Sequence, residues 1–148
     1  MRRNSRSALG IILALTLSAG CGDPVVPIDE ALEPFIGTWD AEVILVTSDA
    51  DTTQVADLME NGSFAINVQE SGSYTATLTF GGIPLTEFGQ VSVGNGVITL
   101  RPDMGQPATS TYVFVTPSYL EVEGPTEFDF NLDGTLDPAV IYMEWRKR

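Results

Sequence analysis

The chain has 148 residues, of which 20 are acidic and seven are basic, and its formal charge is −13 at pH 7. Such an acidic surface repels phosphate backbones, so we expect no nucleic-acid partner. The sequence contains no histidine, which excludes serine–histidine and cysteine–histidine hydrolases. Hydrolysis by paired carboxylates stays chemically open, but no two acids stand out, and we predict a protein without catalytic activity.

Residues 1–20 have the composition of a secretory signal sequence. Arg2, Arg3 and Arg6 form a basic start, and residues 8–20 are uncharged and mostly aliphatic. This run is too short for a membrane-spanning helix, which needs roughly 20 apolar residues. Cleavage after residue 20 removes three of the seven basic residues and no acidic one, so the mature chain carries a formal charge of about −16.

Cys21, the one cysteine of the chain, follows the small and aliphatic residues 17–20 (LSAG). This segment resembles the lipobox of bacterial lipoproteins, in which the cysteine sulfur receives a diacylglycerol and becomes the mature N-terminus. The resemblance implies a lipid anchor on Cys21, with palmitate or a similar second acyl chain, in the cell envelope. Because Gly22 rather than aspartate follows, it also implies the outer membrane. The alternative is an ordinary cleaved signal followed by an unpaired secreted thiol.

Residues 21–34 are rich in proline and acidic residues and are predicted to form a tether, with one helical turn over 28–32. Residues 35–148 are predicted to form a single domain. Apolar and polar residues alternate with period two through this domain, which predicts strands with one buried face. The eight predicted strands are 38–45, 64–69, 73–80, 85–93, 97–101, 109–115, 119–123 and 139–146.

Short connections between these strands favour an antiparallel meander. Gly94, Asn95 and Gly96 predict a tight hairpin turn, since these residues tolerate positive φ. Closing a meander into a barrel removes its exposed edges, so the predicted fold is an all-β, eight-stranded antiparallel up-and-down barrel. A β-sandwich is the alternative.

The start of the first strand contains Gly37 and Trp39. This pair resembles the Gly-x-Trp signature of lipocalins and the wider calycin group. The resemblance covers residues 34–148 and implies that Trp39 plugs the closed end of the barrel. It also implies that a basic residue of the last strand, for which Arg146 is the candidate, lies over the tryptophan ring.

The apolar positions expected to point into the barrel have two interpretations. They line a cavity for an apolar small molecule, or they fill a solidly packed barrel that acts as a structural or protein-interaction module. The positions are Val43, Leu45, Phe64, Ile66, Tyr74, Leu78, Val91, Val113, Leu120, Ile141 and Met143.

Oxygen-bearing side chains alternate along residues 129–137, with Gly134 at the sixth position of a calcium-loop pattern. The residues concerned are Asp129, Asn131, Asp133 and Asp137. The twelfth position, which should be acidic, is Val140. We therefore favour a hairpin turn capped by its own Asp and Asn side chains over calcium, and predict no other cofactor.

The longest connection, residues 48–62, contains Val55, Leu58 and Met59. We expect these apolar residues to form a lid over the open mouth of the barrel or a short helix packed against it.

Overall fold

Nine strands joined mostly by short turns make up most of residues 29–148, the part of the chain that the computed structural model describes. The expected signal sequence of residues 1–20 and Cys21 lie outside the described residues. The elements are η1 (Glu33–Phe35), β1 (Gly37–Ser48), β2 (Val55–Asp57), β3 (Gly62–Val68), β4 (Ser73–Phe80), β5 (Ile83–Gly94), β6 (Val97–Pro102), β7 (Ala108–Thr116), β8 (Tyr119–Phe128) and β9 (Asp137–Lys147). No helix in this range is long and apolar enough to cross a membrane.

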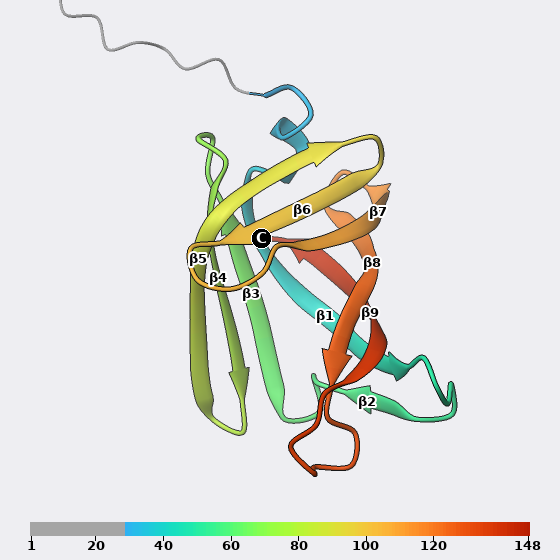
Figure 1. Ribbon diagram of the computed structural model, residues 1–148. Coiled ribbons are helices and arrows are strands. Elements are labelled where there is room, and N and C mark those ends of the chain that lie inside the picture. The colour runs from blue at the N-terminus through green and yellow to red at the C-terminus, as the bar shows by residue number, and fades with distance from the viewer. Residues whose placement is uncertain (1–28) are drawn as a thin grey trace, which may run out of the picture.

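Eight of these strands close into an antiparallel barrel, which confirms the predicted fold and shows that the sandwich alternative is wrong (Figure 1). Apart from β2, each strand pairs with its neighbour in sequence. β9 returns to β1, from Lys147 opposite Trp39 to Ala139 opposite Ser48. Closure gives the first and last strands of the meander a partner on both sides. The architecture is consistent with a calycin-like fold.

The ninth strand, β2, lies in the connection predicted to form a lid or a short helix. It pairs with the second half of β1, and the backbone N–H of Leu58 then donates to the carbonyl of Ile44 at 3.0 Å. Leu58 and Met59 pack against the core, whereas Val55 is exposed. Residues 49–61 contain no helix, so the helical prediction is wrong: bonding to β1 holds this segment extended.

A bulge in β1 reverses the expected direction of two side chains. The register shifts between Ala41 and Val43, so that Ile44 and Val46 are buried in place of Val43 and Leu45. An extra residue in one strand changes which face the following residues occupy. The inward predictions for Val43 and Leu45 are therefore wrong, because they assumed unbroken alternation from Trp39.

Val113 also points away from the interior and is 60% exposed. Its neighbours Tyr112 and Phe114 pack against the core instead. The sequence of β7 has large apolar residues at both odd and even positions, so alternation alone does not identify its inner face. The other predicted positions lie on the inner face, and they are Phe64, Ile66, Tyr74, Leu78, Val91, Leu120, Ile141 and Met143.

One end of the barrel is plugged by η1, at the opposite end of the molecule from the β4–β5 turn (Figure 1). The ring of Phe35 is 1% exposed and meets the rings of Tyr112 and Phe114 edge-on at centroid distances of 4.9 and 5.0 Å. The Trp39 indole N–H donates to the carbonyl of Phe35 at 2.7 Å. Leu32, within the range expected to be tether, is buried beside them, so the packed domain includes it.

Replacing the plug tests this packing. We expect Phe35→Ala to lower the free energy of unfolding by about 3–5 kcal/mol, because it empties a fully buried aromatic site. Phe88→Ala is the matched control, since Phe88 is exposed and its loss costs far less. Urea unfolding measures both variants. A Phe35→Ala protein as stable as the wild type contradicts the plug.

Candidate functional site

The closed end contains the Gly-x-Trp pair, and Lys147 supplies the cation. Gly37 has a φ of +125°, and a Cβ at this position would lie 2.9 Å from Cε of Lys147. The space left by the glycine is therefore filled by the lysine stem. The Lys147 ammonium lies 5.2 Å from the centroid of the Trp39 ring and donates to the carbonyl of Pro34 at 3.3 Å.

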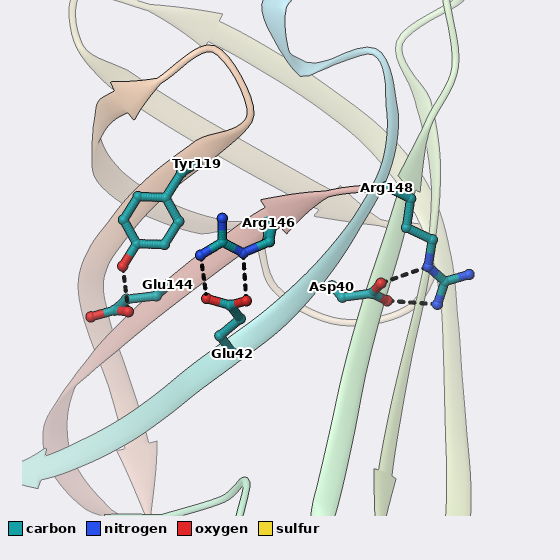
Figure 2. Close-up of polar contacts among 6 residues, drawn as sticks. All are labelled: Asp40, Glu42, Tyr119, Glu144, Arg146 and Arg148. Carbon is teal, nitrogen blue, oxygen red and sulfur yellow. Dashed lines mark hydrogen bonds and ion pairs between the residues drawn. The ribbon is translucent and has the colours of Figure 1, made fainter.

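Arg146, the expected cation over Trp39, lies on the outer face of the barrel. Trp145 is buried, so strand alternation turns residue 146 outward and residue 147 inward. The Arg146 guanidinium donates to both carboxylate oxygens of Glu42, at 2.5 and 2.9 Å, and lies 5.1 Å from the Tyr119 ring centroid (Figure 2). The prediction that Arg146 lies over the Trp39 ring is therefore wrong, because the next residue, Lys147, takes that place.

These contacts belong to a polar seam along β1 and β9 (Figure 2). Arg148 donates to both carboxylate oxygens of Asp40, at 2.5 and 2.7 Å, so a second ion pair crosses from the C-terminus to the first strand. Hydrogen bonding by Arg146 lowers the pKa of Glu42. Exposed ion pairs contribute little each, but two bidentate pairs fix the register of the closing strands.

A large apolar pocket lies over the inner side of the barrel wall and the free edge of β5, toward the end opposite the plug. Its volume is about 670 Å³, and its wall comes mainly from β3, β4 and β5, with Asp103 and Met104 from the connection after β6. The lining residues are Phe64, Ala76, Leu78, Leu85, Thr86, Glu87, Phe88, Asp103 and Met104. Two of the predicted inward residues, Phe64 and Leu78, thus meet here, together with Ala76.

The pocket is open because the β4–β5 hairpin extends beyond its neighbour β6. β5 pairs with β6 only from Gly89 onward, whereas its first half pairs with β4 alone. On the inner side of that half, Leu85 lies opposite Leu78 and Ile83 lies opposite Phe80. Leu85 is 62% exposed and Ile83 is 66% exposed, so the far half of this apolar wall has no covering layer among the described residues.

One polar group at the pocket, the carboxylate of Glu87, is held by Tyr74. Its hydroxyl donates to Glu87 at 2.5 Å, and its ring packs where a side chain on Gly89 would stand, 2.8 Å from an added Cβ. Burial, the hydrogen bond to Glu87 and the charges of Glu87 and Asp103 together raise the pKa of Tyr74 far above its ordinary value. The phenol is therefore a hydrogen-bond donor at every physiological pH.

A second, smaller cavity of about 200 Å³ lies inside the barrel and shares Phe64 with the large pocket. Phe64 stacks on Trp145 at a centroid distance of 5.7 Å. The indole N–H of Trp145 is buried and has no acceptor among the residues that the structure describes. Three predicted inward residues, Phe64, Ile141 and Met143, are brought together at this cavity, beside Trp145.

The calcium-like segment forms a turn capped by its own side chains. The carboxylate of Asp129 accepts the backbone N–H groups of Asp133 and Gly134, at 3.1 and 2.8 Å. Asp133 accepts the N–H of Thr135 at 2.7 Å, and Asp137 already belongs to β9. Within residues 29–148 no group of three His, Cys, Asp or Glu side chains is placed to hold a metal ion.

Sequence reasoning missed the polar members of the pocket. Glu87 lies in β5, which carries apolar residues on both faces, at Leu85 and Phe88. Alternation therefore did not identify which face points inward, and Glu87 was not predicted to face the interior. Asp103 follows Pro102 in a connection and has no periodicity to place it. The signal that could have placed Glu87 is the pair Tyr74 and Gly89, because a glycine opposite an inward tyrosine leaves room for its ring and marks the inner face of β5.

Alkaline titration tests the polar contacts around Glu144, on the strand that carries Arg146. The hydroxyls of Tyr119 and Tyr142 both donate to Glu144. The hydrogen bond to Glu144 raises the pKa of Tyr119 to about 12. Burial, together with its own hydrogen bond to Glu144, raises the pKa of Tyr142 to about 12. A folded-state pKa above the unfolded value of 10.0 gives stability that is present below pH 10 and lost as the pH rises through about 12.

We therefore expect Glu144→Gln to bring the phenolate absorbance of these two tyrosines to lower pH, toward 10. Glu70→Gln, which removes one acidic charge from the β3–β4 turn, is the control and leaves the titration unchanged. Wild type and Glu144→Gln titrating at the same pH would contradict these two hydrogen bonds to Glu144.

The chemistry available at the pocket is apolar contact with a few fixed polar groups. Its wall offers aliphatic and aromatic surface and the carboxylates of Glu87, which the buried Tyr74 phenol holds, and Asp103. No protein-family model matches this sequence, and no curated protein is found to be similar to it.

Proposed function

We propose that this protein is a non-catalytic binding module for an apolar small molecule. The observation that carries the proposal is the uncovered inner wall of β3, β4 and β5 around the pocket of about 670 Å³. Sites for small molecules are typically concave, mostly apolar and roughly 300–1,000 Å³ in volume. The pocket fits this description in size and in the character of its wall.

The contrast between the two ends of the barrel supports the proposal. Phe35, Trp39 and Leu120 are at most 1% exposed, so the plugged end is packed like a protein core. Leu85 and Ile83, which also face inward, are more than half exposed. A barrel that served only as a packed scaffold would gain free energy by burying these side chains, at roughly 25 cal/mol per Å².

A second candidate is an interaction module, and the free edge of β5 favours it. Residues 83–87 of β5 have a strand partner on one side only among the described residues. Such an edge can pair with a strand of another chain. Apolar residues around it, such as Phe80 and Phe88, would then be covered by protein rather than by a small molecule.

Catalysis has little support in the residues present. The sequence has no histidine, and its one cysteine is the proposed lipid-attachment site. Glu87 and Asp103 line the pocket, but Glu87 is held by the Tyr74 phenol in a hydrogen bond that suits binding. The apolar lining and the two carboxylates are suited to recognise a ligand by apolar contact and by charge.

The same proposal places the domain in the cell envelope on a lipid anchor. The basic start, the short aliphatic run and the lipobox-like residues before Cys21 support it. A second acyl chain is needed for stable anchoring, because one chain binds a membrane only marginally. In this arrangement the barrel is a lipocalin-like domain held by its N-terminal side, at the outer membrane where the source has one.

Ligand binding is tested with the neutral fluorophore N-phenylnaphthylamine. We expect saturable binding by the wild-type protein and a loss of roughly tenfold or more in Leu85→Glu, because the new charge must be desolvated in an apolar wall. Val113→Glu is the matched control: Val113 is similarly exposed but lies on the outer face of β7. Equal binding by the two variants, or none by the wild type, contradicts the proposed site.

The anchor is tested by intact-mass analysis of protein extracted from the membranes of its own source. We expect a chain that begins at Cys21 and carries the added mass of acyl groups. Cys21→Ser should lose both the added mass and the membrane association. Native protein with an unprocessed Met1 or an unmodified Cys21 contradicts this part of the proposal.

A further inference from the structure

We infer that the pocket between β3, β4 and β5 selects apolar ligands that carry a positive charge, such as a long-chain amine or a quaternary ammonium amphiphile. The inference rests on the proposed function, since it names the ligand class of the same pocket. It follows from two carboxylates, Glu87 and Asp103, in a wall that is otherwise mostly apolar.

Glu87 stands on the inner side of β5, opposite Ala76. Its Oε1 accepts the hydroxyl of Tyr74 at 2.5 Å. A phenol orients the carboxylate but neutralises no charge. The tyrosine itself is 2% exposed, so it holds Glu87 at a fixed place beside the aliphatic surface of Leu78 and Leu85.

Asp103 reaches the same pocket from the connection after β6. Its backbone N–H donates to the carbonyl of Phe88 at 2.8 Å, which ties this connection to the edge of β5 just beyond the last β5–β6 pair. The charges of both carboxylates act on the Tyr74 hydroxyl. Glu87 and Asp103 therefore contribute to one local negative field at the pocket.

The four basic residues of the described chain make their contacts outside the pocket. Arg146, Lys147 and Arg148 lie at the C-terminal end, in the seam and over the plug described above. The guanidinium of Arg101 donates to Ser92 at 3.3 Å, and none of the four lines the pocket. A fatty-acid anion would thus bring its charge to like charges without a counter-ion, whereas an ammonium group would meet complementary ones.

The aliphatic and aromatic residues define the rest of the ligand. Phe64, Leu78 and Phe88 offer surface to a hydrocarbon chain, and the buried end of the pocket lies at Phe64, next to the inner cavity. The carboxylates and Met104 lie on residues that are exposed to solvent. A ligand with its tail toward Phe64 and its cationic head near Glu87 and Asp103 satisfies both parts of the wall.

The test is displacement of bound N-phenylnaphthylamine from the full protein by three ligands of one chain length: decyltrimethylammonium, decanol and decanoate. Each is used below its micelle-forming concentration, at neutral pH and low salt. We expect the cation to bind about tenfold or more tightly than the anion, with the neutral alcohol between them. High salt should reduce this ratio, because exposed charges are screened.

Two double variants distinguish the effect of the two pocket carboxylates on ligand preference from the effect of the net charge of the protein. Glu87→Gln with Asp103→Asn should bring the ratio close to one while binding of decanol is kept. Glu70→Gln with Glu123→Gln removes the same formal charge outside the pocket and should leave the ratio unchanged. Asp103→Asn alone should give an intermediate ratio of cation to anion affinity. Because Asp103 lies in an exposed connection, this variant should fold even if the double variant does not.

Each result decides between the two claims. Equal affinities for the three ligands, or a preference that survives loss of both pocket carboxylates, overturns the charge selectivity and leaves the binding function standing. An equal loss of preference in the control variant also overturns it, since the effect would then come from net charge. Absence of any binding to the wild-type protein overturns the proposed function and the selectivity together.

Discussion

The pairing of β1 with β9 is the constraint on which the rest of the molecule depends. It joins the two ends of the meander, so every other strand must curve to fit the closed circle. Its register is held on the outside by Glu42 with Arg146 and Asp40 with Arg148, and on the inside by Lys147 over the Trp39 ring. Three of the four basic residues of the described chain thus serve closure, and the pocket is left acidic.

The bulge in β1 connects this seam to the interior. Glu42 is the extra residue, and it points outward to Arg146 while the chain beyond it changes face. Ile44 and Val46 consequently enter the core, and β1 can follow β3 at one end and β2 at the other. A single inserted residue therefore places a salt bridge outside and sets which side chains fill the barrel.

Period-two alternation was sufficient to predict the number of barrel strands and their order, because each strand is bounded by glycine, proline or turn residues. The same reasoning failed where alternation is interrupted or ambiguous, at Val43 and Leu45 after the bulge and at Val113 in a strand with apolar residues on both faces. Lys147 rather than Arg146 covers Trp39 because strand parity, which depends on the inward Trp145, decides between neighbouring cations. Alternation left open whether the interior holds a cavity or is packed solidly. The position of the pocket was not predictable, since it arises from unequal strand lengths rather than from any motif.

Unequal lengths also explain how one barrel can be both plugged and open. The β4–β5 hairpin extends beyond β6, so the inner apolar side of the hairpin has no opposing layer among the described residues. The other end of the barrel is filled by η1. The central claim is that this uncovered wall is where a ligand binds. Methyl NMR with a neutral apolar ligand tests it most directly. The account predicts saturable shifts of the methyl signals of Ala76, Leu78 and Leu85, with those of Val46 and Val68 unmoved. Shifts spread evenly over both groups, or confined to the plugged end, would contradict it.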